Sequence, residues 1–76
     1  MPFTIADLKK GQRATIIDSS SEDIPLKLLE MGCLPGNVVE LLQLAPFHDP
    51  MYLNINDCFL AIRKETAALI IIDNIL

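Results

Sequence analysis

The sequence predicts a single mostly β domain over residues 1–76, a small partly open barrel of about five strands with one main α-helix inserted after the first strand. Short runs rich in β-branched and apolar residues alternate with turn residues, and one segment has helical spacing instead. A chain of 76 residues, 51% of them hydrophobic, can enclose one core. Curling short strands into a barrel removes exposed sheet edges, which favours a barrel over two stacked sheets.

The chain opens with a predicted helical turn and a first strand. In residues 3–8, Thr4 is placed to cap the turn and Asp7 occupies the capping-box position. Gly11 provides a stop for this turn. Residues 13–18 are rich in β-branched side chains and lead into serines, so they predict the first strand followed by a loop.

The main helix is predicted over residues 23–31, where apolar residues recur at i, i+4 and i+7. Gly32 is expected to end this helix. Leu26 falls about 160° from Leu28 on the helical wheel, so its side chain is expected to point away from the core.

A tight corner and a long strand are expected next. Pro35 and Gly36 suit the two central positions of a type II turn, because proline fixes the first φ and glycine accepts the positive second φ. Residues 38–44 are apolar on both alternations and predict the longest strand. Pro46 and Pro50 then predict a stiff loop, since each removes a backbone donor.

The second half of the chain predicts a hairpin and a closing strand. Residues 51–55 show the clearest alternation of apolar and polar side chains. Asn and Asp at 56–57 tolerate left-handed dihedral angles, so residues 58–63 are expected to fold back as the partner strand. A short turn at 64–66 leads to a last strand, 69–72, which is expected to lie beside the first.

Charge and hydropathy disfavour several classes of function. The net charge is −4 and the basic residues form no stripe, which disfavours nucleic-acid binding. The longest apolar run, residues 67–72, is far shorter than the roughly 20 residues of a membrane-spanning helix. The first residues do not resemble a secretory signal, so we expect a cytoplasmic location.

The sequence contains no recognisable catalytic or metal-binding motif, so we expect neither an enzyme nor a bound cofactor. His48 beside Asp49 is the one candidate for acid/base or metal chemistry, but a single histidine is most simply a loop side chain. Cys33 and Cys58 are expected to be free thiols that act as small buried hydrophobes.

Surface residues are therefore the best candidates for function. The outward-pointing Leu26, the stiff loop that bears Phe47 and the outer face of the 51–63 hairpin are expected to offer binding surface. An exposed leucine alone carries little information, because much of any protein surface is apolar. A position of Leu26 close to Phe47 would strengthen the prediction of a partner site.

Four segments resemble the bacterial ferrous iron transport protein A (FeoA) family in order and spacing. These segments are TIADLKKGQ at 4–12, LLEMGCLPGNVVE at 28–40, APFHDP at 45–50 and LAIRKETAA at 60–68. The resemblance covers nearly the whole chain, so we expect the stand-alone form of the protein. The family usually has a glycine in the hairpin turn, where this chain has residues 56–57, and an apolar residue at the position of Cys33.

The resemblance implies an SH3-like barrel with an inserted helix. It further implies a small cytosolic accessory that regulates ferrous iron uptake by contact with the cytosolic part of a GTPase-containing, FeoB-type membrane transporter. On this hypothesis the partner-binding residues are Leu26, Lys27, Glu30 and Phe47. The matching motif residues are expected to be structural: Gly32, Pro35, Gly36, Pro46 and Pro50.

Two alternatives remain open. An iron-sensing module would collect Fe²⁺, at least weakly, with His48, Asp49 and a cysteine. A peptide-binding module would be related to the C-terminal SH3-like domain of iron-dependent repressors of the diphtheria toxin repressor type. Peptide binding needs an aromatic-lined groove, which a chain with one Tyr and no Trp disfavours.

Overall fold

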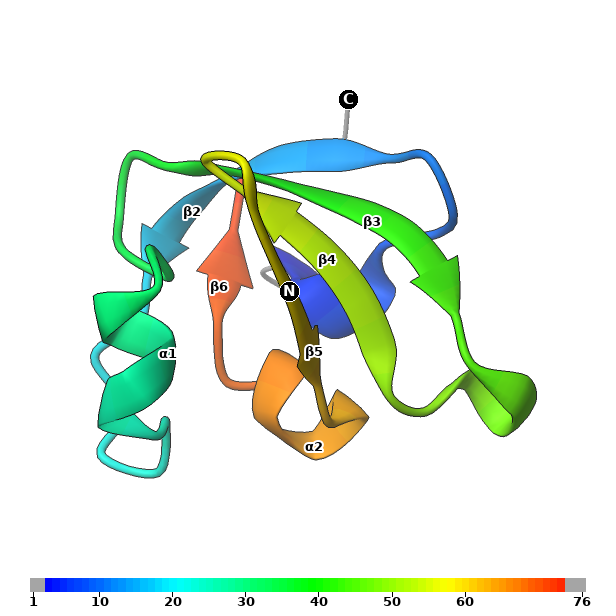
Figure 1. The fold of residues 1–76 in the computed structure, drawn as a ribbon. Coiled ribbons are helices and arrows are strands. Elements are labelled where there is room, and N and C mark those ends of the chain that lie inside the picture. The colour runs from blue at the N-terminus through cyan, green and yellow to red at the C-terminus, as the bar shows by residue number, and fades with distance from the viewer. Residues whose placement is uncertain (1–2, 74–76) are drawn as a thin grey trace.

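The computed structural model describes residues 3–73, apart from the side chain of His48, and forms one curled six-stranded sheet (Figure 1). The strands are β1 (Phe3–Thr4), β2 (Arg13–Asp18), β3 (Val38–Leu44), β4 (Met51–Ile55), β5 (Cys58–Ile62) and β6 (Ile71–Ile72). The short helices are η1 (Ile5–Asp7), α1 (Leu26–Glu30), η2 (Pro46–His48) and α2 (Lys64–Ala67). The result is the small, mostly β, partly open barrel that the sequence predicts.

All strand pairs are antiparallel, in the order β1-β6-β2-β3-β4-β5. The closing strand β6 lies beside β2, as expected, with Ile16 opposite Ile72. A bulge interrupts the pairing of β3 with β4 between Leu41 and Gln43. Strands β1 and β5 are the two edges of the sheet.

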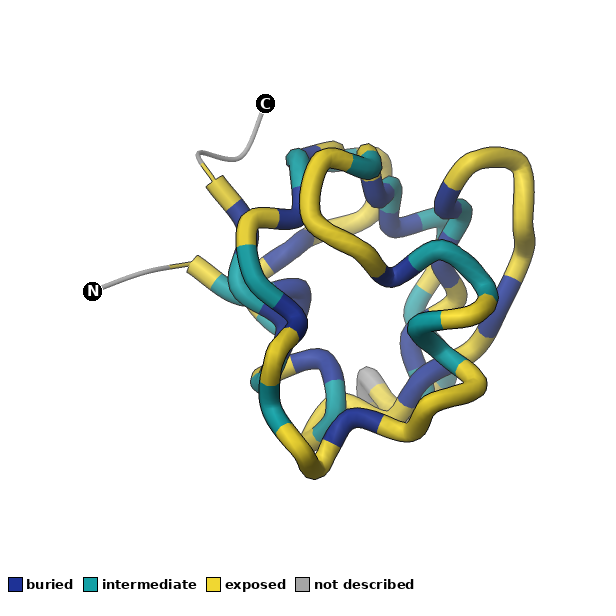
Figure 2. Tube along the Cα trace, turned by 90° about the vertical axis from the view of Figure 1, so that its left-hand side faces the viewer, coloured by how far each residue is buried: buried dark blue, intermediate teal, exposed yellow. Residues whose placement is uncertain are grey.

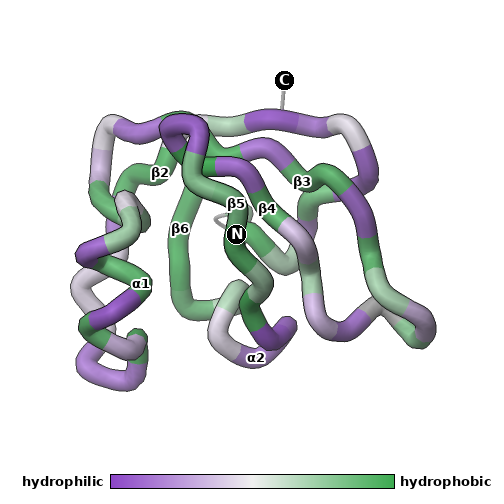
Figure 3. The backbone as a smooth tube through the Cα atoms, in the orientation of Figure 1, coloured by the Kyte–Doolittle hydropathy of each residue, from purple (hydrophilic) through white to green (hydrophobic). Residues whose placement is uncertain are grey.

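One core fills the barrel, and the trace in Figure 2 encircles it with buried positions contributed from all sides. On β4 the burial alternates, so that Met51, Leu53 and Ile55 are buried while Tyr52 is exposed. In Figure 3 strands β5 and β6 are hydrophobic along their length, hydrophobic and hydrophilic positions mix along β3 and β4, and the turn between β4 and β5 is hydrophilic. The alternation predicted for residues 51–55 is therefore confirmed.

The predicted turns are confirmed by their dihedral angles. Gly36 has a φ of +95°, and the N–H of Asn37 donates to the carbonyl of Leu34 at 3.2 Å, which closes the turn. Asn56 and Asp57 both have positive φ, of 51° and 65°, as a two-residue hairpin turn requires. In η1, Asp7 accepts the backbone N–H of Thr4 at 2.8 Å.

The main helix is shorter than predicted, because α1 begins at Leu26 and not at residue 23. Pro25 is the N-cap residue, and the residue before a proline is disfavoured in the helical region, so Ile24 cannot belong to the helix. Ile24 is instead buried in a turn, where its N–H donates to the carbonyl of Ser21 at 3.2 Å.

The end of the chain also differs from prediction. Residues 64–66 belong to helix α2, and the last strand is only Ile71–Ile72. The N–H of Lys64 at the start of α2 donates to Oδ1 of Asp49 at 3.0 Å, a contact between distant segments that no local pattern reveals. Strand β1 was not predicted, because two residues are too short to show a periodicity.

Gly32 joins α1 to the barrel in a conformation that favours glycine, with a φ of +110°. Its carbonyl accepts a hydrogen bond from Nδ2 of Asn37 at 2.8 Å. A Cβ atom at this position would lie 3.4 Å from Cγ2 of Ile55, which is fully buried in β4. The predicted structural role of Gly32 therefore has a specific basis in its backbone conformation, because a Cβ atom at 3.4 Å would be in ordinary van der Waals contact with Ile55.

We predict that Gly32→Ala destabilises the protein by about 1–3 kcal/mol, because a residue with a Cβ atom rarely adopts a φ of +110°. Gly11→Ala is the companion variant, since Gly11 also has a positive φ, +86°, and has open space around the added atom. Because the backbone conformation sets the cost at both positions, we expect losses of similar size. Urea unfolding measures both, and an unchanged stability of Gly32→Ala would contradict the prediction.

Candidate partner-binding surfaces

Helix α1 presents three of the predicted contact residues on one exposed face. Leu26 is 68% exposed, and Lys27 and Glu30 are also exposed. Residues three and four apart are neighbours on a helix, so Glu30 lies beside both Leu26 and Lys27. The prediction that Leu26 points away from the core is confirmed.

The opposite face of α1 fixes the helix to the barrel. Leu28 and Leu29 are half-buried and pack against the core. The N–H of Met31 donates to the carbonyl of Lys27 at 3.0 Å, and the N–H of Cys33 donates to that of Leu28 at 3.1 Å. Leu26 is therefore exposed on a short helix whose opposite face is packed against the core.

Phe47, the fourth predicted contact residue, lies elsewhere. It belongs to η2, which Figure 1 shows on the opposite side of the molecule from α1. The proximity of Leu26 to Phe47 that would have strengthened the prediction of a single partner site is therefore not found. The separation has a physical reason, because β3 carries the chain across the whole barrel between the two segments.

Phe47 has two unusual properties of its own. Its side chain is 98% exposed, and its backbone is left-handed with a φ of 67° and a ψ of 17°. A non-glycine residue in this region is strained, and a large aromatic gains nothing from burial here. Phe47 is therefore an almost fully exposed aromatic side chain on a strained backbone.

The outer face of β4 and β5 forms a shallow apolar groove of about 400 Å³. Tyr52 is 42% exposed and Phe59 is 70% exposed. In the strand register, Tyr52 lies opposite Ala61. The groove is lined by Leu42, Tyr52, Leu53, Phe59, Leu60 and Ala61. The sequence predicted the outer face of this hairpin as binding surface, and the register of the two-residue turn accounts for Tyr52 and Phe59 lying on the same face.

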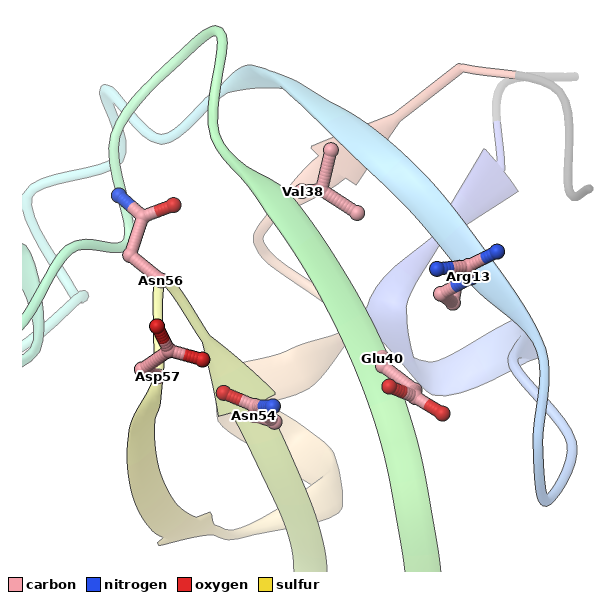
Figure 4. A pocket seen from close by; sticks show the side chains of 6 residues that line it. All are labelled: Arg13, Val38, Glu40, Asn54, Asn56 and Asp57. Carbon is pink, nitrogen blue, oxygen red and sulfur yellow. The ribbon is translucent and has the colours of Figure 1, made fainter.

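A second, polar pocket of about 210 Å³ lies across β2, β3 and the hairpin turn (Figure 4). It is lined by Arg13, Val38, Glu40, Asn54, Asn56 and Asp57. In Figure 4 the hairpin residues lie on one side of β3 and Arg13 lies on the other. Oδ1 of Asn54 is buried and has no hydrogen-bond partner within the described residues. This pocket offers hydrogen bonds to a polar group but no nucleophile.

The described residues do not form the metal site that the iron-sensing alternative requires from His48, Asp49 and a cysteine. Asp49 is engaged with α2, since its Oδ1 accepts the N–H of Lys64 and its Oδ2 lies 3.8 Å from Nη1 of Arg63. The His48 side chain lies outside the described residues. Among the side chains that are described, no three His, Cys, Asp or Glu residues could hold a metal ion together.

The two cysteines have different environments. Cys33 is fully buried, as predicted, and burial raises the pKa of its thiol to about 11. Cys58 is exposed, so the prediction that it is buried is wrong. Cys58 is the first residue of the edge strand β5. It lies on the same alternation as Leu60 and Ile62, which are buried further along the strand, but at the end of the strand its side chain is exposed.

The fold is that of a small SH3-like barrel. It superimposes on the zinc complex of Stenotrophomonas maltophilia FeoA, described as a procaryotic SH3 domain protein, with a TM-score of 0.78 at 20% identity, over 93% of this chain and 89% of that one. T. acidophilum IdeR shares the fold at 20% identity and a TM-score of 0.75, over 93% of this chain and 33% of that one.

Sequence comparison identifies the family. The model of the FeoA domain matches residues 3–74, and the chain belongs to the FeoA domain family. The FeoA protein of Chlorobium tepidum has 28% identity and a TM-score of 0.85, over 93% of this chain and 69% of that one. A Porphyromonas gingivalis Fe(2+) transport protein A/Fe(2+) transporter FeoB fusion protein is 34% identical over 65 residues. That match covers 84% of this chain and 8% of the fusion protein.

We predict that a maleimide modifies Cys58 rapidly and Cys33 only when the protein unfolds. The thiolate is the reactive species, and Cys33 is both buried and protonated at neutral pH because its pKa is raised. Mass spectrometry of the native and urea-unfolded protein counts the modified thiols. Fast modification of Cys33 in native Cys58→Ser protein would contradict the burial described here.

Replacing Phe47 tests whether its backbone is strained. Phe47→Gly is expected to stabilise the protein by about 1 kcal/mol, because glycine adopts the left-handed conformation freely. Phe47→Ala removes the same ring but retains the strain, so its stability is expected to stay close to that of the unmodified protein. Thermal unfolding of both variants makes the comparison, and a loss of stability in Phe47→Gly would contradict it.

Proposed function

We propose that the chain is a small non-enzymatic accessory of ferrous iron uptake, which binds the cytosolic part of a FeoB-type ferrous iron transporter. The observation that carries this proposal is the P. gingivalis relative, in which Fe(2+) transport protein A and the FeoB transporter form one fusion protein. Fusion holds two domains at a high effective concentration, which favours a contact between them. A separate chain of the same family would make that contact by binding.

The exposed face of α1 is the surface we propose for this contact. An apolar anchor with charged residues around it is the usual composition of a small protein interface, and Leu26 has the charged residues Lys27 and Glu30 as its neighbours on the exposed face. The half-buried side of α1 fixes the helix in place. Little conformational entropy is then lost when a partner packs against Leu26.

Phe47 is proposed as a second, separate contact. Because η2 lies on the opposite side from α1, one flat partner surface cannot cover both. A single transporter domain that contacts both Leu26 and Phe47 has to wrap around the barrel. Otherwise two separate domains have to bind the chain at the same time. The two contacts can therefore be tested independently.

A peptide-binding role is the second candidate, and the groove between Tyr52 and Phe59 favours it. Aromatic-lined grooves bind extended peptide segments in SH3 domains. The composition argues against such a groove, but the fold brings two of the four aromatic side chains, Tyr52 and Phe59, to one face. An Fe²⁺-sensing role remains a proposal that metal titration of the same labelled protein would test.

The test of the accessory role is a titration of isotope-labelled protein with the purified cytosolic domain of the transporter and with the whole transporter in detergent. Backbone amide signals are followed with and without guanine nucleotide. We expect saturable shifts on α1, and we expect Leu26→Ala to weaken binding by about tenfold or more, as truncation of a central anchor does.

Leu34→Ala is the matched control, because Leu34 is also an exposed leucine but lies outside α1. The affinity of Leu34→Ala for the transporter is expected to equal that of the unmodified protein. Full binding by Leu26→Ala would refute the assignment of α1, and absence of any shift with either form of the transporter would refute the accessory role itself.

A further inference from the structure

The edge strand β5 lacks the features that usually protect an exposed sheet edge. It pairs with β4 through all five of its residues, and within residues 3–73 it has no other strand partner. Edge strands are normally very short, charged, bulged or interrupted by proline. Residues 58–62 read CFLAI, with no charge and no proline, and the register with β4 is regular. Such a strand is a template for a further strand.

The hairpin turn determines which backbone groups of β5 are available. In a two-residue hairpin the residues that flank the turn, here Ile55 and Cys58, form a hydrogen-bonded pair, and pairs of this type alternate along the ladder. Phe59 and Ala61 therefore occupy the positions whose N–H and C=O groups point away from β4. Both residues are also exposed, so these groups face the free edge.

A second copy of β5 fits this edge in one antiparallel register. If the two strands cross at Leu60, Phe59 of each copy pairs with Ala61 of the other, and the outward backbone groups face one another. Continued one residue past each end of β5, the same register brings Asp57, in the hairpin turn, near Arg63 of the other copy. Asp57 is exposed and borders the polar pocket in the single chain, so its side chain would turn toward the free edge to make this pair. Because the arrangement has two-fold symmetry, the opposite charges meet twice.

Neighbouring registers lose this charge match. A shift of two residues in one direction brings Asp57 opposite Glu65, which is repulsive, and a shift in the other direction brings it opposite Ala61. Within a single copy, Arg63 pairs with Asp49 at 3.8 Å, and its side chain is 72% exposed. A long, exposed ion pair is weak, so Arg63 is free to turn toward a second chain.

The outer face is also complementary in size. Phe59 of one copy would lie beside Ala61 of the other, where a small side chain leaves room above the sheet. Ala61 is next to Tyr52 across the strands, so the incoming ring would enter the apolar groove at Tyr52. The most exposed aromatic side chain of the sheet would thereby be covered in both copies.

We propose that two copies of this chain associate through β5, antiparallel and centred on Leu60, with two Asp57–Arg63 ion pairs at the ends. The result is one continuous sheet across the dimer. A contact of two short strands is smaller than a standard interface of about 1,600 Å², so we expect a reversible dimer with a dissociation constant on the order of micromolar. The proposal does not involve α1 and is independent of transporter binding.

Sedimentation velocity over a range of protein concentrations measures the association. Two charge reversals give the sharpest test. Asp57→Lys and Arg63→Glu are each expected to sediment as monomers, since each places like charges opposite one another twice. An equal mixture of the two is expected to restore the dimer, because the heterodimer pairs Lys with Glu and Arg63 with Asp57.

Control variants separate this surface from general charge effects and from misfolding. Asp23→Lys and Lys27→Glu make the same charge changes away from β5, and they are expected to leave the dimer intact. Ala61→Pro removes the outward N–H, which makes no hydrogen bond to β4, and its ring would stand at the free edge, so it is expected to abolish association. Asp57→Asn removes the charge but keeps a residue that tolerates the left-handed turn, and it is expected to weaken the dimer. This variant replaces Asp57→Lys in the test if Asp57→Lys does not fold. Circular dichroism checks each fold.

The unmodified protein should dimerise at concentrations of about 10–100 µM, as a micromolar constant requires. A protein that stays monomeric over this range would overturn the proposal. A dimer that survives Ala61→Pro, or a mixture of folded Asp57→Lys and Arg63→Glu proteins that stays monomeric, would also overturn it, because either result places the contact on another surface or in another register.

Discussion

The cross-strand pairing of β3 with β4 is the constraint on which the rest of the molecule depends. Val39 lies opposite Ile55 and Leu41 opposite Leu53, and all four side chains are fully buried. A slip of one residue would turn every one of them to solvent, so the core determines this register strongly. Ile55 in turn lies at contact distance from residue 32, so the end of α1 packs directly against this ladder. The position of Leu26 is thus a consequence of packing in the central ladder.

The same register creates both pockets on the outer face. Tyr52 and Asn54 alternate with the buried residues of β4, so Tyr52 enters the apolar groove and Asn54 enters the polar pocket. The bulge in β3 has a related effect. It leaves Leu42 in the groove and lets Leu44 pair with the buried Met51 beyond it. The apolar residues on both alternations of 38–44 are therefore explained by a bulge as well as by cover on two faces.

Local patterns predicted the elements whose causes are local. The alternation of 51–55, the turns at Gly36 and at 56–57, and the outward position of Leu26 all follow from neighbouring residues, and all are observed. The failures concern contacts between distant segments. Asp49 accepts the first N–H of α2, and Cys58 is exposed because β5 ends the sheet. For the contact residues, the sequence identified exposure correctly at Leu26 and Phe47, but their separation depends on the path of β3 across the barrel.

The proposed partner contact and the proposed self-association use separate parts of this small barrel, and this separation would have a consequence for affinity. A dimer formed through β5 carries two copies of α1 related by two-fold symmetry. A partner that itself exposes two equivalent sites at a matching distance would be bound at both, and the second contact would form at a high effective concentration. A partner with one site would gain nothing from the dimer. Joining the domain to a transporter, as in the fusion relative, places one copy at each transporter chain, so the symmetry of that assembly would determine whether the β5 edges can meet.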